Sequence, residues 1–301
     1  MIKSVKVTNY LGESQVMELR NPEKSGFLIS SIEGVSSGKA NINTTNIATK
    51  DGAYFNSAHI EPRNIILGLK LLAKPTIEEA RHKLYRLFQP KRLVRLDFVL
   101  DTRECYIEGY VEENPVEIFS SSESTRISII CPDPFFKAMN EVTEVFSGVV
   151  GQFEFPFENV SISEKLLEFG SVSFYTEKNI IYEGEDEIGL EFQIHASGSV
   201  GDITIYNTVS HESMVFSSEK LSEYLGEGIK DGDDLIITTM AGNKGITLLR
   251  EGLYYNVLNC LGRYSDWFQL SNGENIFTYS ATYGVLNLEF TAKYRPVYGG
   301  I

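Results

Sequence analysis

Short runs in which every second residue is apolar recur along the chain and constrain its fold most. In one such run, 93–100, Val94, Leu96 and Phe98 share a face, because successive side chains of a strand point to opposite sides. The runs with the same pattern are 104–111, 125–131, 172–176, 188–195, 202–207, 234–239, 245–249 and 285–292. In the last of them the residues expected to face inward are Leu286, Leu288, Phe290 and Ala292. Turn-forming stretches separate the runs, so the sequence predicts a mostly β protein, with antiparallel strands arranged as two sandwiches.

One segment departs from this pattern and has the signals of a helix. Thr76 and Glu79 have the spacing of an N-terminal capping box, with Pro75 just before and Pro90 just after the segment. The apolar residues at helical spacing are Ile77, Ala80, Leu84, Leu87 and Phe88. A stripe of this kind packs against other apolar groups, so we expect a helix at 76–89 that covers a sheet or a neighbour.

The length of the chain and the distribution of its charges divide it into two parts. A chain of 301 residues exceeds the usual size of one domain. Residues 1–138 contain 18 Lys and Arg against 17 Asp and Glu, whereas residues 139–301 contain 9 against 24. We expect one domain at 1–138 and a second at 139–301, with the boundary placed to within about ten residues and a linker over 139–170. The acidic second half is unsuited to general binding of polyanions.

The basic residues of the helix and the following strand form the one cationic cluster in the sequence. Its members are Arg81, Lys83, Arg86, Lys91, Arg92 and Arg95. Such a cluster is either a solvated helix face or a contact surface for a subunit or an anionic partner. Recognition of a nucleic-acid sequence is not expected, since no helix-turn-helix, zinc-finger or RNP pattern surrounds it.

The three cysteines and the apolar segments bear on where the protein folds. Cys105, Cys131 and Cys260 are an odd number at wide spacings in strand-like contexts, and we expect them to be buried and reduced, in a protein that folds in a cytoplasm. The first residues lack the apolar core of a leader, and no run of 18 apolar residues occurs. Insertion into a membrane is therefore not expected.

Patterns that carry catalysis or cofactor binding are absent from the sequence. Walker, dinucleotide-binding and nucleophile-elbow motifs do not occur, and the four histidines form no metal-binding pattern. Asp231, Asp233 and Asp234 resemble part of a calcium loop but lack its later Glu, which favours a turn before a strand. We therefore expect no enzyme activity, no cofactor and no metal site.

The one tryptophan, Trp267, is the residue best suited to contact a ligand. If Phe268 and Leu270 point into a sheet, then Trp267 and Gln269 lie on the other face. An exposed aromatic ring there can stack on a sugar or anchor a protein contact. The alternative is a partly buried Trp that packs against the domain, as large side chains usually do.

Several blocks of the sequence together resemble a known family. They are 28–56, 62–72 with the helix and basic strand after it, 131–137, 235–252, 256–281 and 285–301. The most specific part is the order WFQL at 267–270, NGEN at 272–275 and KYRP at 293–296. In order and extent these blocks are similar to the distal tail proteins of siphophages, also called the phage tail component family.

This resemblance implies a structural virion protein at the distal tail tip, made and assembled in the cytoplasm of the host bacterium. It implies an N-terminal β-sandwich belt domain with one helix and a C-terminal galectin-like β-sandwich. Six copies would form a ring hub between the tail tube protein and the tail-associated hub or lysin protein, with a receptor-binding protein as a further partner. The polar stretch 34–52 and the helix are the expected sources of the ring contacts. The alternative function is an adhesion module that binds cell-wall glycan through Trp267.

Overall fold

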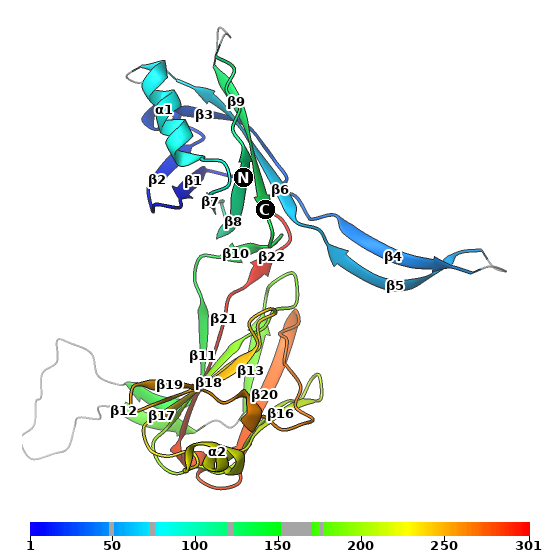
Figure 1. Cartoon of the computed structure of the whole chain (residues 1–301), viewed down its shortest axis with the longest axis vertical. Helices are drawn as coiled ribbons and strands as arrows, with labels where there is room; N and C mark the ends of the chain where they lie inside the picture. The colour runs from blue at the N-terminus through cyan, green and yellow to red at the C-terminus, as the bar shows by residue number, and fades with distance from the viewer. Residues whose placement is uncertain (48–50, 73–75, 119–122, 152–169, 175–176) are drawn as a thin grey trace, which may run out of the picture. The chain divides into compact units, whose positions relative to one another are not determined.

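The computed structural model describes the chain except for residues 48–50, 73–75, 119–122, 152–169 and 175–176 (Figure 1). The chain forms two compact units. Unit 1 comprises Met1–Asn140 and Val297–Ile301, and unit 2 comprises Glu141–Pro296. The last five residues thus belong to unit 1, whereas length and charge predicted a second domain over the whole of 139–301. No helix among the described residues is both long and apolar enough to span a membrane.

The strands of unit 1 belong mainly to one antiparallel sheet, in the order β2-β1-β7-β8-β9-β6-β3, with β10 and β22 attached beside β8. Their bounds are β1 (Ser4–Asn9), β2 (Ser14–Glu18), β3 (Phe27–Glu33), β6 (Arg63–Leu71), β7 (Leu93–Val99), β8 (Glu104–Glu113), β9 (Ser124–Cys131), β10 (Phe136–Ala138) and β22 (Val297–Tyr298). The two edge strands, β2 and β3, contact each other, so the sheet curls. These strands of unit 1 thus form one continuous sheet.

The helix α1 (Ile77–Leu87) covers the core of unit 1. The hydroxyl of Thr76 accepts a hydrogen bond from the backbone N–H of Glu79 at 3.2 Å, which confirms the predicted N-cap. The buried residues of the helix are Ala80, Leu84 and Leu87, joined by Phe88 at its C-cap. They pack with alternate residues of the strands, such as Leu96 and Phe98 of β7. The amphipathic helix and the period-two strands therefore form one core, as the sequence predicted.

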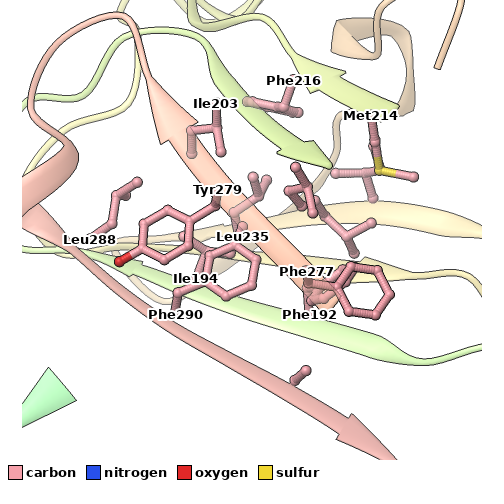
Figure 2. Packing of buried hydrophobic residues seen from close by; sticks show 14 of the residues in the cluster. Phe192, Ile194, Ile203, Met214, Phe216, Leu235, Phe277, Tyr279, Leu288 and Phe290 are labelled. Atoms are coloured by element: carbon pink, nitrogen blue, oxygen red, sulfur yellow. The ribbon is translucent and has the colours of Figure 1, made fainter. Parts of the chain in front are cut away.

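Unit 2 is a sandwich of two antiparallel sheets. The larger has the order β12-β11-β21-β14-β17-β18-β19 and the smaller the order β13-β20-β15-β16. Their bounds are β11 (Val142–Gly151), β12 (Gly170–Phe174), β13 (Glu177–Tyr182), β14 (Glu191–Ala196), β15 (Ile203–Asn207), β16 (Glu212–Phe216), β17 (Asp233–Thr238), β18 (Gly245–Arg250), β19 (Leu253–Asn256), β20 (Gly273–Ala281) and β21 (Leu288–Tyr294). Aromatic rings fill the space between the sheets (Figure 2): Phe192 of β14 lies 5.5 Å from Phe277 of β20, centroid to centroid.

Three features of unit 2 differ from the sequence predictions. Strand β11 lies within the predicted linker. The sequence did not predict it, because Glu144 occupies an inward-facing position and interrupts the alternation of apolar residues. In the structure Glu144 forms an ion pair with Lys178 at 3.0 Å. The helix α2 (Ser218–Leu225) was not predicted; it is short, although Ser217 caps its start and Gly226, at φ +86°, ends it. Leu286 is 66% exposed rather than inward-facing, because Val285–Asn287 form a 3₁₀ turn before β21.

The three cysteines are free and buried, as the sequence predicted. In unit 1, burial raises the pKa of Cys105 from its ordinary 9.0 to about 11 and that of Cys131 to about 12, because an apolar interior disfavours the thiolate. The native state therefore holds these protons more tightly than the unfolded chain does. The stability that this difference provides is present below pH 9 and is lost as the pH rises through the native values.

We expect the free energy of unfolding of unit 1 to fall as the pH is raised from about 9 to about 11. Urea denaturation followed by circular dichroism at several pH values measures this. A variant with Cys105→Ala and Cys131→Ala is the control, and its stability should fall less over the same interval. Equal slopes for both proteins would mean that the thiols do not cause the loss.

Candidate assembly surface

A two-stranded hairpin, separate from the large sheet of unit 1, is the most exposed regular element of that unit. It consists of β4 (Ala40–Asn46) and β5 (Ala53–Ile60), paired antiparallel with each other alone. Figure 1 shows it as a long blue arm that projects from the strands β3 and β6. Every residue of the two strands is exposed except Ile60, which is half-buried. The polar stretch 34–52, which the sequence predicted as a source of ring contacts, contains strand β4.

Cross-strand pairing assigns the hairpin residues to two faces of different character. Partners directly opposite each other share a face, and the register pairs Ala40 with Ile60, Ile42 with Ala58 and Thr44 with Phe55. We call the surface made by Ala40, Ile42, Phe55, Ala58 and Ile60 the apolar face of the hairpin. The opposite face carries Asn41, Asn43, Thr45, Tyr54, Ser57 and His59. On that side the Asn43 side chain donates to the Ser57 hydroxyl at 3.0 Å.

The apolar face is open to solvent and is not protected by charge. Ile42 is 58% and Phe55 67% exposed, and the two strands contain no Lys, Arg, Asp or Glu. Exposed strands usually carry charged residues that prevent pairing with other chains, and an isolated two-stranded hairpin is only marginally stable in water. These properties are typical of an element that is covered by a partner. The alternation of Ala40 and Ile42 with Asn is the signal from which the sequence could have predicted the strand.

Two cations of the predicted basic cluster on α1, Arg81 and Arg86, form ion pairs with acidic residues of unit 1. The Arg81 guanidinium forms an ion pair and two hydrogen bonds with Glu123, and this contact raises its pKa. Arg86 pairs with Glu13, although its side chain remains 67% exposed. These ion pairs join the helix to two other segments of unit 1. A structural role of Arg81 therefore explains its position without any external partner.

The cations after the helix lie on the sheet or near its edge. Arg95 donates to Asp97 at 2.6 Å, and its guanidinium stacks over the ring of Tyr106 at 3.7 Å from the centroid. Arg92 lies over the ring of Tyr10 at 4.9 Å. Lys91, at φ +69°, is exposed. Lys83, Arg86, Lys91 and Arg92 are thus the exposed members of the cluster. Of these, Arg86, Lys91 and Arg92 stay candidates for an interface.

Trp267 is half-buried and packs against the core of unit 2. Phe268 and Leu270 are buried, as period two predicted. The ammonium of Lys244 lies 5.7 Å from the Trp267 ring centroid. Part of the ring surface is therefore covered by the protein itself, which favours the packing role over the sugar-binding role.

We expect Trp267→Ala to lower the free energy of unfolding of unit 2 by about 1–3 kcal/mol, because a partly buried ring loses its contacts. Urea denaturation measures the change, and Tyr264→Ala is the control, since that ring is 86% exposed. Binding to purified bacterial cell walls separates the two roles. Loss of wall binding in a Trp267→Ala protein of unchanged stability would support the adhesion role instead.

The three aspartates considered as a cation loop have separate roles. Asp233 is buried and accepts hydrogen bonds from two guanidinium nitrogens of Arg250, at 2.8 and 2.6 Å. Asp234 binds His195 at 2.7 Å on the outer side of the sheet. Asp231 lies in the turn that precedes strand β17. Among the described residues, no three His, Cys, Asp or Glu side chains are grouped as metal ligands.

Comparison with protein families gives a match over part of unit 1. Residues 21–131 match the model of the phage tail protein RIFT-related domain, a range that includes the hairpin, α1 and most of the sheet of unit 1. This part of unit 1 is therefore similar to a domain of phage tail proteins. A search of curated proteins gives no significant match.

Comparison with solved structures finds similar folds over nearly the whole chain. The crystal structure of SPP1 Dit, described as a paradigm of the hub adsorption apparatus in phages that infect Gram-positive bacteria, matches at a TM-score of 0.64 and 13% identity over 97% of this chain and 98% of that one. A chain of the activated phage P2 baseplate with Ca matches at a TM-score of 0.45 and 13% identity over 98% of both chains. The first match shows that this chain shares the fold of SPP1 Dit.

Proposed function

We propose that this protein is a structural hub of a phage tail, which forms a ring of six copies at the distal tail tip. The tail protein domain and the overall fold support this assignment. The feature that best supports self-assembly is the β4–β5 hairpin, because it has an exposed apolar face and no charged residue in its strands. A second copy of the chain is the partner of this face.

A closed ring requires two different surfaces on each subunit, because its contacts are heterologous. The apolar face of the hairpin is one of them. The exposed cations Arg86, Lys91 and Arg92 are candidates for the second. The ring would bind the tail tube protein on one side and the tail-associated hub or lysin protein on the other, with a receptor-binding protein at its periphery. We place its assembly in the cytoplasm of the host bacterium and its final location at the tail tip of the virion.

Light scattering on a sizing column tests the proposal. The expected species has six times the chain mass of 33.8 kDa and is a ring with a central hole in negative-stain images. Because the tail tube protein can act as a template, the measurement is repeated in its presence. A protein that stays monomeric in both conditions would contradict the ring.

A further inference from the structure

Arg63 lies at the root of the hairpin, at the point where the chain leaves β5 and enters β6. It is 6% exposed, and its guanidinium lies over the ring of Phe136 at 4.8 Å from the centroid. It donates hydrogen bonds to four backbone carbonyls in three other segments: Pro134 at 2.7 Å, Gly34 at 2.8 Å, Ser36 and Gly299. Among the described residues no carboxylate pairs with it. All hydrogen bonds that the structure shows for this buried cation thus go to backbone carbonyls.

One of these carbonyls comes from the segment 297–301, which returns to unit 1 after unit 2. This segment makes several further contacts there. The backbone N–H of Ile301 donates a hydrogen bond to the Val35 carbonyl at 3.0 Å. Val297 and Tyr298 pair with strand β10. The Arg103 guanidinium donates to the Gly300 carbonyl at 3.1 Å. Segment 297–301 therefore covers the connection between β3 and β4, which is one of the two chain segments at the hairpin root.

We infer that Arg63 and segment 297–301 form a clasp that fixes the root of the hairpin, and that the clasp closes only after the sequence of unit 2 has been made. The clasp closes late because residues 297–301 are synthesised after residues 141–296. The consequence for self-assembly rests on the proposed function. A hairpin whose root is not fixed cannot present its apolar face in one orientation, so assembly waits until both units are complete.

An open clasp is unfavourable because of what happens to the hydrogen bonds of Arg63. Without segment 297–301 the Nη2 group of the guanidinium loses the Gly299 carbonyl, and a buried charged donor that is left without its acceptor is unfavourable. Desolvation already lowers the pKa of Arg63. The side chain would then turn towards water and release its bonds to Gly34 and Ser36 as well. Loss of one segment is thereby transmitted to the hairpin root.

Two variants of the full chain test the clasp. Arg63→Lys keeps the charge but cannot make the same set of hydrogen bonds, since an ammonium lacks the planar fork of a guanidinium. Gly300→Ala leaves Arg63 intact and acts from the other side, because a Cβ at position 300 would lie 2.9 Å from the backbone nitrogen of Ser37. The control is Arg126→Lys, whose side chain is 64% exposed and pairs with Glu33 on the surface.

Amide hydrogen exchange and oligomer mass are the two measurements. We expect exchange in residues 34–40 to become about ten-fold faster in both clasp variants, with the ring lost or weakened, and to change less than about two-fold in the control. Trp267 fluorescence verifies that unit 2 remains folded. Wild-type exchange rates at the root in both variants would overturn the clasp, whatever the oligomer mass. If the wild-type protein forms no ring, the proposed function fails, while the exchange rates still decide the clasp.

Discussion

Phe290→Ala is expected to lower the free energy of unfolding of unit 2 by about 3–5 kcal/mol. Phe290 of β21 is fully buried at the centre of the aromatic core shown in Figure 2. Its ring stacks on Tyr279 with centroids 4.7 Å apart and planes at 7°. The rings of Phe146 and Phe192 lie at 4.9 and 5.3 Å. Truncation removes contacts with both sheets of the sandwich and leaves a cavity that close-packed neighbours cannot fill.

Urea denaturation monitored by Trp267 fluorescence measures this loss, since Trp267 lies in unit 2. Leu286→Ala is the matched control, because Leu286 precedes the same strand but is 66% exposed; it should change the stability by less than about 0.5 kcal/mol. Similar losses for the two variants would show that β21 is not part of the central core. A loss confined to Phe290→Ala supports the two-sheet packing.

The strands that the sequence predicted correctly are those in which period two is unbroken. In β7 and β14 each inward position is apolar and each is buried, so the pattern by itself indicates the buried face. β11 was missed because Glu144 stands at an inward position, and its partner Lys178 lies on another strand. The β4–β5 hairpin was missed because its outward residues are Asn and Thr, which are common in turns. Its apolar residues are small or widely spaced.

The candidate site depends on pairs that are distant in the sequence, and such pairs cannot be read from spacing. The sequence located the cations at 81–95, but Arg81 finds its partner 42 residues away and Arg86 finds Glu13 73 residues away. Arg63 and Gly299 are separated by 236 residues. Local patterns predict faces of elements; only the fold determines which charges neutralise each other. The basic cluster at 81–95 therefore presents less net positive charge on the surface than its sequence indicates.

Ile42→Lys combined with Phe55→Lys is expected to weaken self-association by about 100-fold or more, without a change in the stability of unit 1. Burial of two ammonium groups in an apolar contact is costly, and each central apolar residue of an interface contributes on the order of 2 kcal/mol. The monomer tolerates the change because both side chains are more than half exposed. Analytical ultracentrifugation over a range of protein concentrations, with the tail tube protein present and absent, measures the effect.

The matched control has the same two added charges on the other face of the hairpin, at Asn43→Lys and Thr45→Lys. Cross-strand pairing places these residues opposite Ser57 and Tyr54. If the apolar face is the one that a second copy covers, the control retains most of its self-association, whereas the test variant remains monomeric. Equal weakening by both pairs would indicate that net charge, and not the apolar face, governs assembly. An intact ring in the test variant would move the contact to another surface, such as the one around Arg86 and Arg92.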